Sequence, residues 1–375
     1  MTGSAPTSRP RVLVVIGTRP EGIKLAPVVA ALEARGEEVE VETALTGQHT
    51  DLMDQVLQVF GLRIDAARDL GIMREGQDLY DVAHGCLDGL RRVVRDYRPE
   101  LVLVQGDTAT VFLASLVAFF ERTKVGHVEA GLRSHDKWRP YPEEIFRKLT
   151  GVLADVHFAP TRGARDNLLR EGVPADRVHV TGNTVVDALQ RIAGEPREAR
   201  NEQLARALAE VETGKRMILL TAHRRESFGA PMREAFRAVR EIADLFEDVL
   251  VLYPVHPNPN VRAAASEQMS DHSRISLTAP LDYFDLVTAL QKASLVITDS
   301  GGIQEEAPTF GKPVLVLREV TERPEGVEAG IAEITGTDRE TIVGLASAIL
   351  SGGGWPALVD YRRRRRAGRT VRIAI

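Results

Sequence analysis

The sequence has very little cysteine: Cys86 is the single one among 375 residues. One cysteine excludes a disulfide framework and a thiolate metal cluster. Long apolar runs are also lacking, since none approaches the ~20 residues that a membrane-spanning helix needs. The first ten residues have no apolar core, so we do not expect them to be a secretory signal. We therefore expect a cytoplasmic protein with no membrane partner.

An excess of one charge is missing as well. The 48 Lys and Arg residues are matched by 53 Asp and Glu residues, giving a net charge of −5, which argues against a nucleic-acid partner. Aromatic residues make up only 5% of the chain, and their scattered positions give no base-stacking platform. A length of 375 residues with 43% hydrophobic content is typical of two globular domains of ~150–200 residues each.

Short apolar runs alternate with helical patterns along both halves of the chain. Such runs are typical of parallel strands that are buried on both faces of a sheet. We predict an α/β protein with two Rossmann-like domains facing across a cleft, an N-terminal one over residues 1–188 and a C-terminal one over residues 189–375 that ends in an Arg-rich tail, 360–375. The predicted strands lie at 11–16, 39–45, 101–104, 125–128, 217–220, 249–253, 295–298 and 314–317.

Polar residues gather where these runs end, which is where open parallel sheets bind ligands. After the first run, Gly17 to Lys24 lacks the G-x-G-x-x-G dinucleotide fingerprint. It does place two cations, Arg19 and Lys24, at the start of a predicted helix, which suits an anion. The alternative is that both are solvated surface charges.

Four carboxylates follow other strands of the first half: Asp107, Glu129, Glu143 and Glu144. Carboxylates crowded into one pocket raise one another's pKa and can serve as general acids and bases near neutrality. Simpler alternatives exist for three of them. Asp107 could be a helix N-cap, and Glu143 and Glu144 could open a solvated helix, where acidic residues favour the helix dipole.

The second half contributes a matching set of polar strand ends. His223 and Arg224 follow one strand and His256 follows another. Asp299-Ser-Gly-Gly-Ile-Gln-Glu-Glu306 opens a helix whose N–H groups could hold a pyrophosphate, with Glu306 one turn in and able to take two ribose hydroxyls. Arg323 adds a cation near the same edge. The chain has no H-E-x-x-H zinc motif and no G-x-S-x-G serine-hydrolase elbow.

Taken together, these stretches resemble the non-hydrolysing UDP-N-acetylglucosamine 2-epimerase family. The resemblance runs from about residue 11 to residue 345 through GTRPEGIKLAP, GDTATV, GHVEAGLRS, PYPEEIFRKLT, TAHRRESFG, TDSGGIQEEAP and GKPVLVLREVTERPEGVEAG. It implies two Rossmann-like domains of the glycosyltransferase-B type and an isomerase that works without nicotinamide or metal. It further implies that UDP-GlcNAc and UDP-ManNAc are interconverted by elimination of UDP to 2-acetamidoglucal and re-addition to the opposite face.

The resemblance also implies roles for residues at matching positions. The catalytic residues would be Asp107, Glu129, Glu143 and His223. The substrate would be bound by Arg19, Lys24, Ser300, Gly301, Gly302, Glu306 and Arg323. A second UDP-GlcNAc would act as an activator at a site formed by Gln48, His49, Glu144, Arg224 and His256.

The sequence departs from the family at three places. Leu286 stands where the family has an aromatic residue that stacks on uracil, so we expect either an apolar contact or a neighbouring ring, Tyr283 or Phe284, in its place. Asp51 and Gly76 replace residues of the activator site, which weakens that site. The Arg-rich tail replaces the helix that crosses back to the first domain in the family.

Three other functions remain open at this point. A hydrolysing relative would use the same pocket but release ManNAc and UDP. A glycosyltransferase could share the fold, because fold alone does not determine function. A UDP-sugar-binding module with little turnover is the third. The resemblance also implies a homodimer, and it leaves open whether the product feeds polysaccharide or secondary-metabolite biosynthesis.

Overall fold

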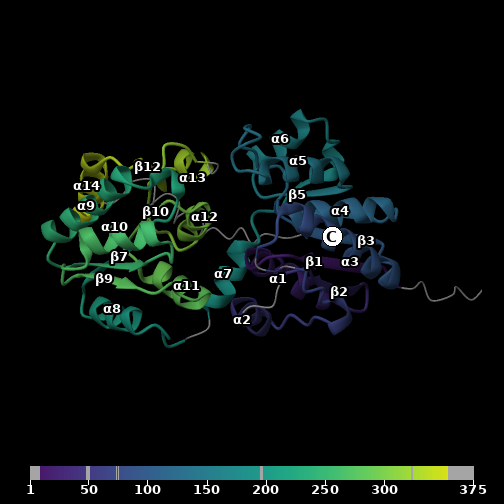
Figure 1. Cartoon of the computed structure of the whole chain (residues 1–375), viewed down its shortest axis with the longest axis horizontal. Coiled ribbons are helices and arrows are strands. Elements are labelled where there is room, and N and C mark those ends of the chain that lie inside the picture. Colours follow the sequence, from purple (N-terminus) through teal and green to yellow (C-terminus); the bar gives the residue numbers. More distant parts are fainter. Residues whose placement is uncertain are drawn as a thin grey trace, which may run out of the picture. The chain divides into compact units, whose positions relative to one another are not determined.

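The computed structural model describes residues 9–47, 51–72, 74, 76–194, 197–321 and 324–353. It divides into two compact units, the first ending at Ala188 and the second beginning at Leu189. Helices and strands alternate throughout both units (Figure 1). Each unit is described by itself below.

The first unit contains a six-stranded parallel sheet in the order β2-β1-β3-β4-β5-β6. Its central strands are largely apolar, and β1 is apolar and buried from its second residue onward. The strands are β1 (Arg11–Ile16), β2 (Glu40–Leu45), β3 (Leu101–Gln105), β4 (Lys124–Val128), β5 (Val156–Ala159) and β6 (Val178–Val180). The helices are α1 (Arg19–Glu33), α2 (Asp51–Phe60), α3 (Leu79–Tyr97), α4 (Ala109–Phe120), α5 (Glu143–Leu153) and α6 (Arg162–Arg170). The next helix, α7 (Val185–Ala193), begins in the first unit and ends in the second.

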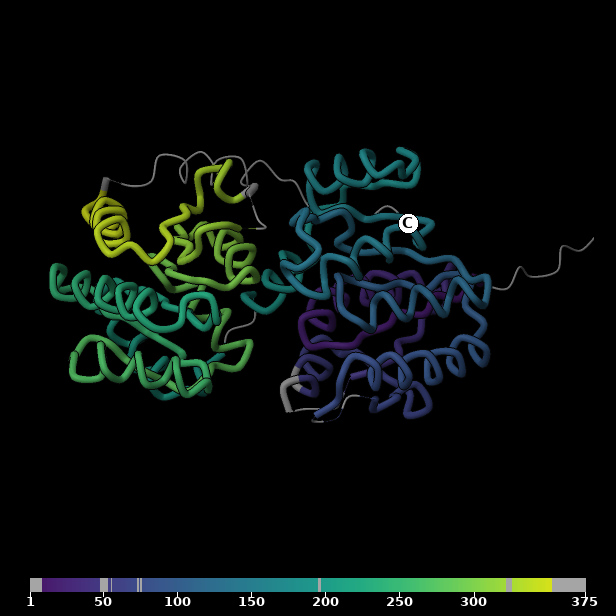
Figure 2. The backbone as a smooth tube through the Cα atoms, turned by 45° about the horizontal axis from the view of Figure 1, so that its top comes forward, coloured from purple at the N-terminus to yellow at the C-terminus, as the bar shows by residue number. Residues whose placement is uncertain are grey.

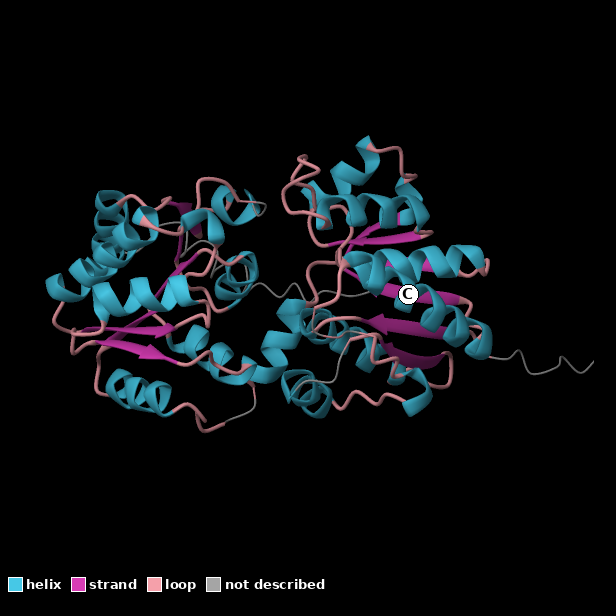
Figure 3. Ribbon diagram, viewed as in Figure 1, coloured by secondary structure: helices cyan, strands magenta, loops and turns pink. Residues whose placement is uncertain are grey.

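The second unit contains another six-stranded parallel sheet, in the order β12-β11-β10-β7-β8-β9. Helices flank the strands, as the colouring by secondary structure shows (Figure 3). The strands are β7 (Arg216–Thr221), β8 (Val249–Pro254), β9 (Ile275–Thr278), β10 (Leu295–Thr298), β11 (Val314–Val316) and β12 (Ala332–Ile334). The helices are α8 (Glu202–Glu212), α9 (Ala230–Leu245), α10 (Pro259–Met269), α11 (Tyr283–Lys292), α12 (Gly301–Thr309), α13 (Pro324–Glu328) and α14 (Arg339–Ala348).

Both sheets are doubly wound, but their strand orders differ. The second sheet, counted from β9, follows the order 3-2-1-4-5-6 of Rossmann folds, whereas the first follows the 2-1-3-4-5 order of flavodoxin-like folds with one strand added. Successive strands are added on one side of the sheet and then on the other, and the change occurs between β1 and β3 in the first unit and between β7 and β10 in the second. Figure 2 follows the chain by colour. Parallel sheets bind ligands at these switch points.

Candidate functional site

Asp107 lies at the switch point of the first sheet, directly after β3. It does not cap a helix: the N-cap of α4 is Thr108, whose side chain accepts a hydrogen bond from the N–H of Val111 at 3.5 Å. The Asp107 carboxylate instead forms an ion pair with the guanidinium of Arg147, from α5. The alternative that Asp107 is an N-cap is therefore wrong, and its side chain is available for a site.

Glu129, the first residue after β4, is held by two cations. Its side chain is 4% exposed and pairs with Lys24 Nζ from α1, while Arg147 Nη2 lies 3.4 Å from its second oxygen. Arg147 also donates a hydrogen bond to the Glu129 carbonyl. The backbone of Glu129 has φ = 61°, in the left-handed region that residues other than glycine rarely adopt. Backbone strain of this kind is concentrated at functional sites.

Arg147 therefore joins the two candidate catalytic carboxylates, Asp107 and Glu129. Its own side chain is only 5% exposed, and buried charges are tolerated only when they are paired and hydrogen-bonded. The sequence analysis did not single out Arg147. The available signal was its spacing, since it follows Glu143 by four residues, one turn of the same helix.

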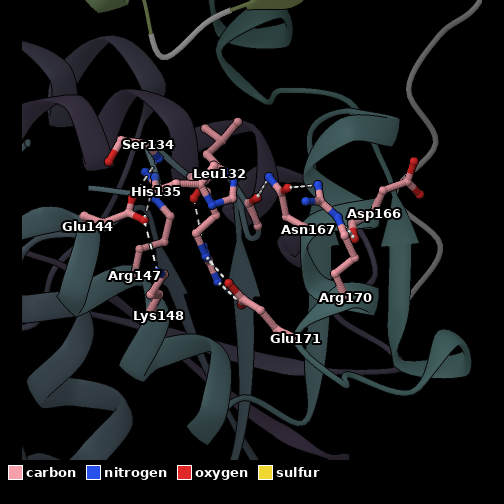
Figure 4. Close-up of polar contacts among 12 residues, drawn as sticks. Leu132, Ser134, His135, Glu144, Arg147, Lys148, Asp166, Asn167, Arg170 and Glu171 are labelled. Carbon is pink, nitrogen blue, oxygen red and sulfur yellow. Dashed lines mark hydrogen bonds and ion pairs between the residues drawn. The ribbon is translucent and has the colours of Figure 1, made fainter. Parts of the chain in front are cut away.

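Glu143 and Glu144 do open a helix, α5, as one alternative predicted. Glu144 is not solvated, however, because it is 4% exposed and accepts hydrogen bonds from the N–H groups of Ser134 at 2.9 Å and His135 at 3.2 Å. Figure 4 shows its carboxylate beside these two residues, with Lys148 near one oxygen. Glu143 is half-buried, and its Oε2 is shielded from solvent without a hydrogen-bond partner among the described residues.

The second unit has its own polar centre at the switch point between β7 and β10. Asp299, which follows β10, is 1% exposed and accepts hydrogen bonds from the N–H groups of His223 at 2.6 Å and Arg224 at 2.8 Å. His223 Nδ1 also lies 3.2 Å from Asp299 Oδ1. The sequence analysis quoted Asp299 as the start of a motif but gave it no role. The structure makes it the residue that holds the loop of His223.

The His223 ring is partly exposed and stacks on His256, with ring centroids 5.5 Å apart and planes at 15°. Burial lowers the pKa of His223, and the neighbouring Arg224 and His256 lower it further, whereas Asp299 opposes them. These effects favour the neutral form of the imidazole, which can accept a proton or pass one on.

The N-terminus of α12 lies beside this centre in the sequence. Its N-cap is Ser300, whose side chain makes no capping hydrogen bond to the helix, and Gly301 and Gly302 form the first turn. The Ser300 N–H donates to Thr298 Oγ1 at 2.9 Å, which fixes the approach of the chain to the helix. A helix start with small residues and no capping side chain suits an anion. Glu306 is half-buried one turn further along the helix.

Leu286, at the expected uracil position, is half-buried and packs on the apolar core of the second sheet. The two rings before it are not alternatives at the surface, since Tyr283 is 5% and Phe284 6% exposed. The Arg197 guanidinium covers the Phe284 ring at 4.5 Å. Of the two expectations, an apolar contact by Leu286 agrees with this packing better than stacking by a neighbouring ring.

Several predicted residues fall outside what the structure describes: Gln48, His49, Arg323 and the tail 360–375. Of the other residues predicted for an activator site, Glu144 is engaged by its own loop. Arg224 has a buried Nε without a hydrogen-bond partner in the described part of the chain. Arg19 is the first residue of α1 and is half-buried.

Among the described residues, no cluster of His, Cys, Asp and Glu is suited to a metal ion, and no helix is long and apolar enough to cross a membrane.

The two parallel sheets and their polar switch points define an α/β protein of the glycosyltransferase-B type. Similarity to solved structures supports this class, including a glycotransferase of kitacinnamycin biosynthesis at 14% identity and a TM-score of 0.60, which bears on the fold alone. The model of the UDP-N-acetylglucosamine 2-epimerase family matches residues 30–365.

Individual relatives agree. UDP-N-acetylglucosamine 2-epimerase of Bacillus subtilis is 48% identical over 341 residues, 91% of this chain and 87% of that protein. The Neisseria meningitidis UDP-GlcNAc 2-epimerase, solved with UDP-GlcNAc, has a TM-score of 0.83 and 37% identity over 95% of this chain and 99% of its own. Staphylococcus aureus MnaA, solved with UDP, has a TM-score of 0.83 and 41% identity over 94% and 91%. The chain belongs to the UDP-N-acetylglucosamine 2-epimerase family.

Proposed function

We propose that this chain interconverts UDP-GlcNAc and UDP-ManNAc. The C1–O bond to UDP breaks and C2 loses its proton, which gives 2-acetamidoglucal. UDP then adds back to C1 while a proton is delivered to the opposite face of C2. The observation that carries this proposal is the cluster in which Asp107 and Glu129, two carboxylates able to exchange a proton, are fixed by the shared cation Arg147.

The proposed division of labour follows the two switch points. Asp107, Glu129 and Glu143 of the first unit would handle the C2 proton, with Arg19 and Lys24 beside them. In the second unit, the α12 N-terminus at Ser300, Gly301 and Gly302 would bind the pyrophosphate, Glu306 and Arg323 the ribose and its phosphate, and His223 the departing phosphate. Because C2–H is a weak acid, departure of UDP must lead, and stabilisation of the leaving group is the main electrostatic task.

Proton NMR of UDP-GlcNAc with the enzyme in heavy water tests the proposal. We expect UDP-ManNAc with deuterium at C2, because the proton removed from one face exchanges with solvent before one is returned to the other. Free ManNAc with UDP would instead identify a hydrolysing enzyme. An unchanged spectrum would contradict the proposal and favour a module that only binds UDP-sugars or a glycosyltransferase of the same fold.

Three further expectations remain predictions: a homodimer, which the resemblance to the family implies; a cytoplasmic location, which is expected from the lack of long apolar runs; and a weakened activator site, where the sequence departs from the family. Sedimentation velocity tests the first. For the third, a lag or a sigmoidal rate against UDP-GlcNAc concentration would indicate activation by a second substrate molecule, and hyperbolic kinetics would argue against it.

A further inference from the structure

Glu21 is a buried carboxylate that the proposed reaction does not use. It lies in the first turn of α1 and is 2% exposed. Its Oε2 accepts a hydrogen bond from the N–H of Gly17 at 2.6 Å, and its Oε1 accepts from the hydroxyls of Thr18 at 3.1 Å and Thr108 at 2.8 Å. The contacts with Gly17 and Thr18 resemble an ordinary helix cap, but the contact with Thr108 reaches a different element.

Thr108 connects Glu21 to the site. It follows Asp107 directly and is the N-cap of α4. The starts of α1 and α4 are also in close contact here, because a Cβ added to Gly17 would lie 2.4 Å from Thr110 Oγ1. Glu21 thus ties together the two helix starts that flank the switch point between β1 and β3.

The contacts of Glu21 complete a closed ring of contacts, and both candidate carboxylates, Asp107 and Glu129, belong to this ring. From Thr108 the chain leads to Asp107, whose ion pair with Arg147 leads to Glu129. Glu129 pairs with Lys24, which lies three residues after Glu21 on α1. Every member of the ring is therefore fixed by two neighbours, and Glu21 is the link between α1 and the loop of Asp107.

The opposite side of the same loop is held by the backbone. The Gly106 N–H donates to the carbonyl of Val128 at 3.1 Å, and its carbonyl contacts His127 Nε2 at 2.8 Å. Burial lowers the pKa of His127 to about 3, so this imidazole is neutral and its Nε2–H donates a hydrogen bond to the Gly106 carbonyl. Asp107 thus lies between Gly106, anchored to β4, and Thr108, anchored to Glu21.

From this ring we infer that Glu21 is a positioning residue, which holds Asp107 through Thr108 and Lys24 through the start of α1. This inference rests on the proposed function. Small displacements of reacting groups are costly in catalysis, since an error of about 1 Å can reduce the rate about 100-fold. A carboxylate that only capped α1 would leave kcat unchanged when its contact with Thr108 is removed.

Paired substitutions at both ends of the contact test the inference. Glu21→Met and Thr108→Val remove it while preserving approximate volume. Thr108→Ser keeps the hydroxyl. Glu21→Gln keeps all three contacts, since its oxygen can accept from Gly17 N–H and its amide can donate to the two threonine hydroxyls. Thr150→Val is the matched control, because Thr150 is fully buried and its hydroxyl has no hydrogen-bond partner among the described residues.

We expect Glu21→Met and Thr108→Val to lower kcat by about 10- to 100-fold, with KM and the Kd for UDP within about twofold of wild type. Each kcat is normalised to the fraction of protein that binds UDP, so that loss of folded protein is not counted. Because the contact between Glu21 and Thr108 is lost in either variant, the effects of the two substitutions on kcat should be less than additive in the double variant. Glu21→Gln, Thr108→Ser and Thr150→Val should retain the wild-type kcat.

The inference is overturned if folded Thr108→Val has the kcat of Thr150→Val, or if Thr108→Ser loses as much as Thr108→Val. If Glu21→Met fails to fold, the Thr108 pair decides alone. Failure of the proposed function is recognised separately, because the wild-type enzyme itself would then give no UDP-ManNAc.

Discussion

The buried carboxyl of Glu21 makes the stability of this protein depend on pH in an unusual direction. Burial raises the pKa of Glu21 from 4.5 to about 7, although its hydrogen bonds with Gly17, Thr108 and Thr18 oppose the shift. Between these two values the folded state binds more protons at this position than the unfolded state does. The free energy of unfolding therefore falls as pH rises through this window, and the loss is complete above about pH 7.

Glu21→Gln removes this titration and keeps the shape of the side chain. The difference between 4.5 and about 7, at about 1.4 kcal/mol per pH unit, corresponds to about 3 kcal/mol in full. Between pH 5 and pH 8 most of that amount is developed, so we expect wild type to lose about 2–3 kcal/mol relative to Glu21→Gln. Cys86, which lies near Glu21, does not contribute because burial raises its pKa to about 11.

Urea unfolding followed by far-UV circular dichroism, at pH 5, 6, 7 and 8, measures this difference. The remaining ionisable groups are common to both proteins and cancel when one curve is subtracted from the other. Thr150→Val should follow the wild-type pH dependence. A difference between wild type and Glu21→Gln that is constant across the series, or that changes in favour of wild type as pH rises, would refute the reasoning.

Three further outcomes follow from other contacts. Arg147→Met removes the cation that Asp107 and Glu129 share and should lower the free energy of unfolding in urea by about 3 kcal/mol. An unchanged value would show that this cation is not needed for stability. Asp299→Asn removes the charge that opposes the lowered pKa of His223, so NMR titration should find that pKa lower still; a rise would contradict the assignment. Gly17→Ala places a Cβ 2.4 Å from Thr110 Oγ1 and should lower the free energy of unfolding by about 1–3 kcal/mol. An unchanged free energy of unfolding in urea would show that α4 can shift to accommodate the methyl group.

The fold class was predictable because most strands are continuous apolar runs. The prediction of strands at 11–16, 217–220 and 295–298 is confirmed within one residue at each end. Four strands were missed: β5, β6, β9 and β12. These have three or four residues and include polar ones, such as His179 between Val178 and Val180. Such short segments are strands because neighbouring strands pair with them, which local sequence does not show.

The polar residues at the strand ends were also predictable, since chain order and parallel strands are enough to bring them to one edge of a sheet. What sequence spacing does not contain is which of them make contact. Arg147 reaches Asp107 and Glu129 from a helix that starts 36 residues after Asp107, and Glu21 reaches Thr108 across 87 residues of sequence. The contact of Glu21 with Thr108 arises because the strand order of the first sheet reverses between β1 and β3, which brings the starts of α1 and α4 together. The contacts of Arg147 arise because β3 and β4 are neighbours in the sheet and α5 packs against α4.

Each unit uses a buried carboxylate to hold a loop beside its switch point, although the two carboxylates lie at different positions in the fold. In the first unit Glu21, in the first turn of α1, accepts hydrogen bonds from hydroxyl and backbone donors and has a raised pKa, so it costs stability when ionised. In the second unit the buried carboxylate Asp299, directly after β10, accepts hydrogen bonds from two backbone N–H groups and faces an imidazole. Each arrangement uses a buried acid to hold a loop in place. Burying an acid lowers the stability of the folded state, and in return the buried acid fixes the loop that carries Asp107 in the first unit and His223 in the second.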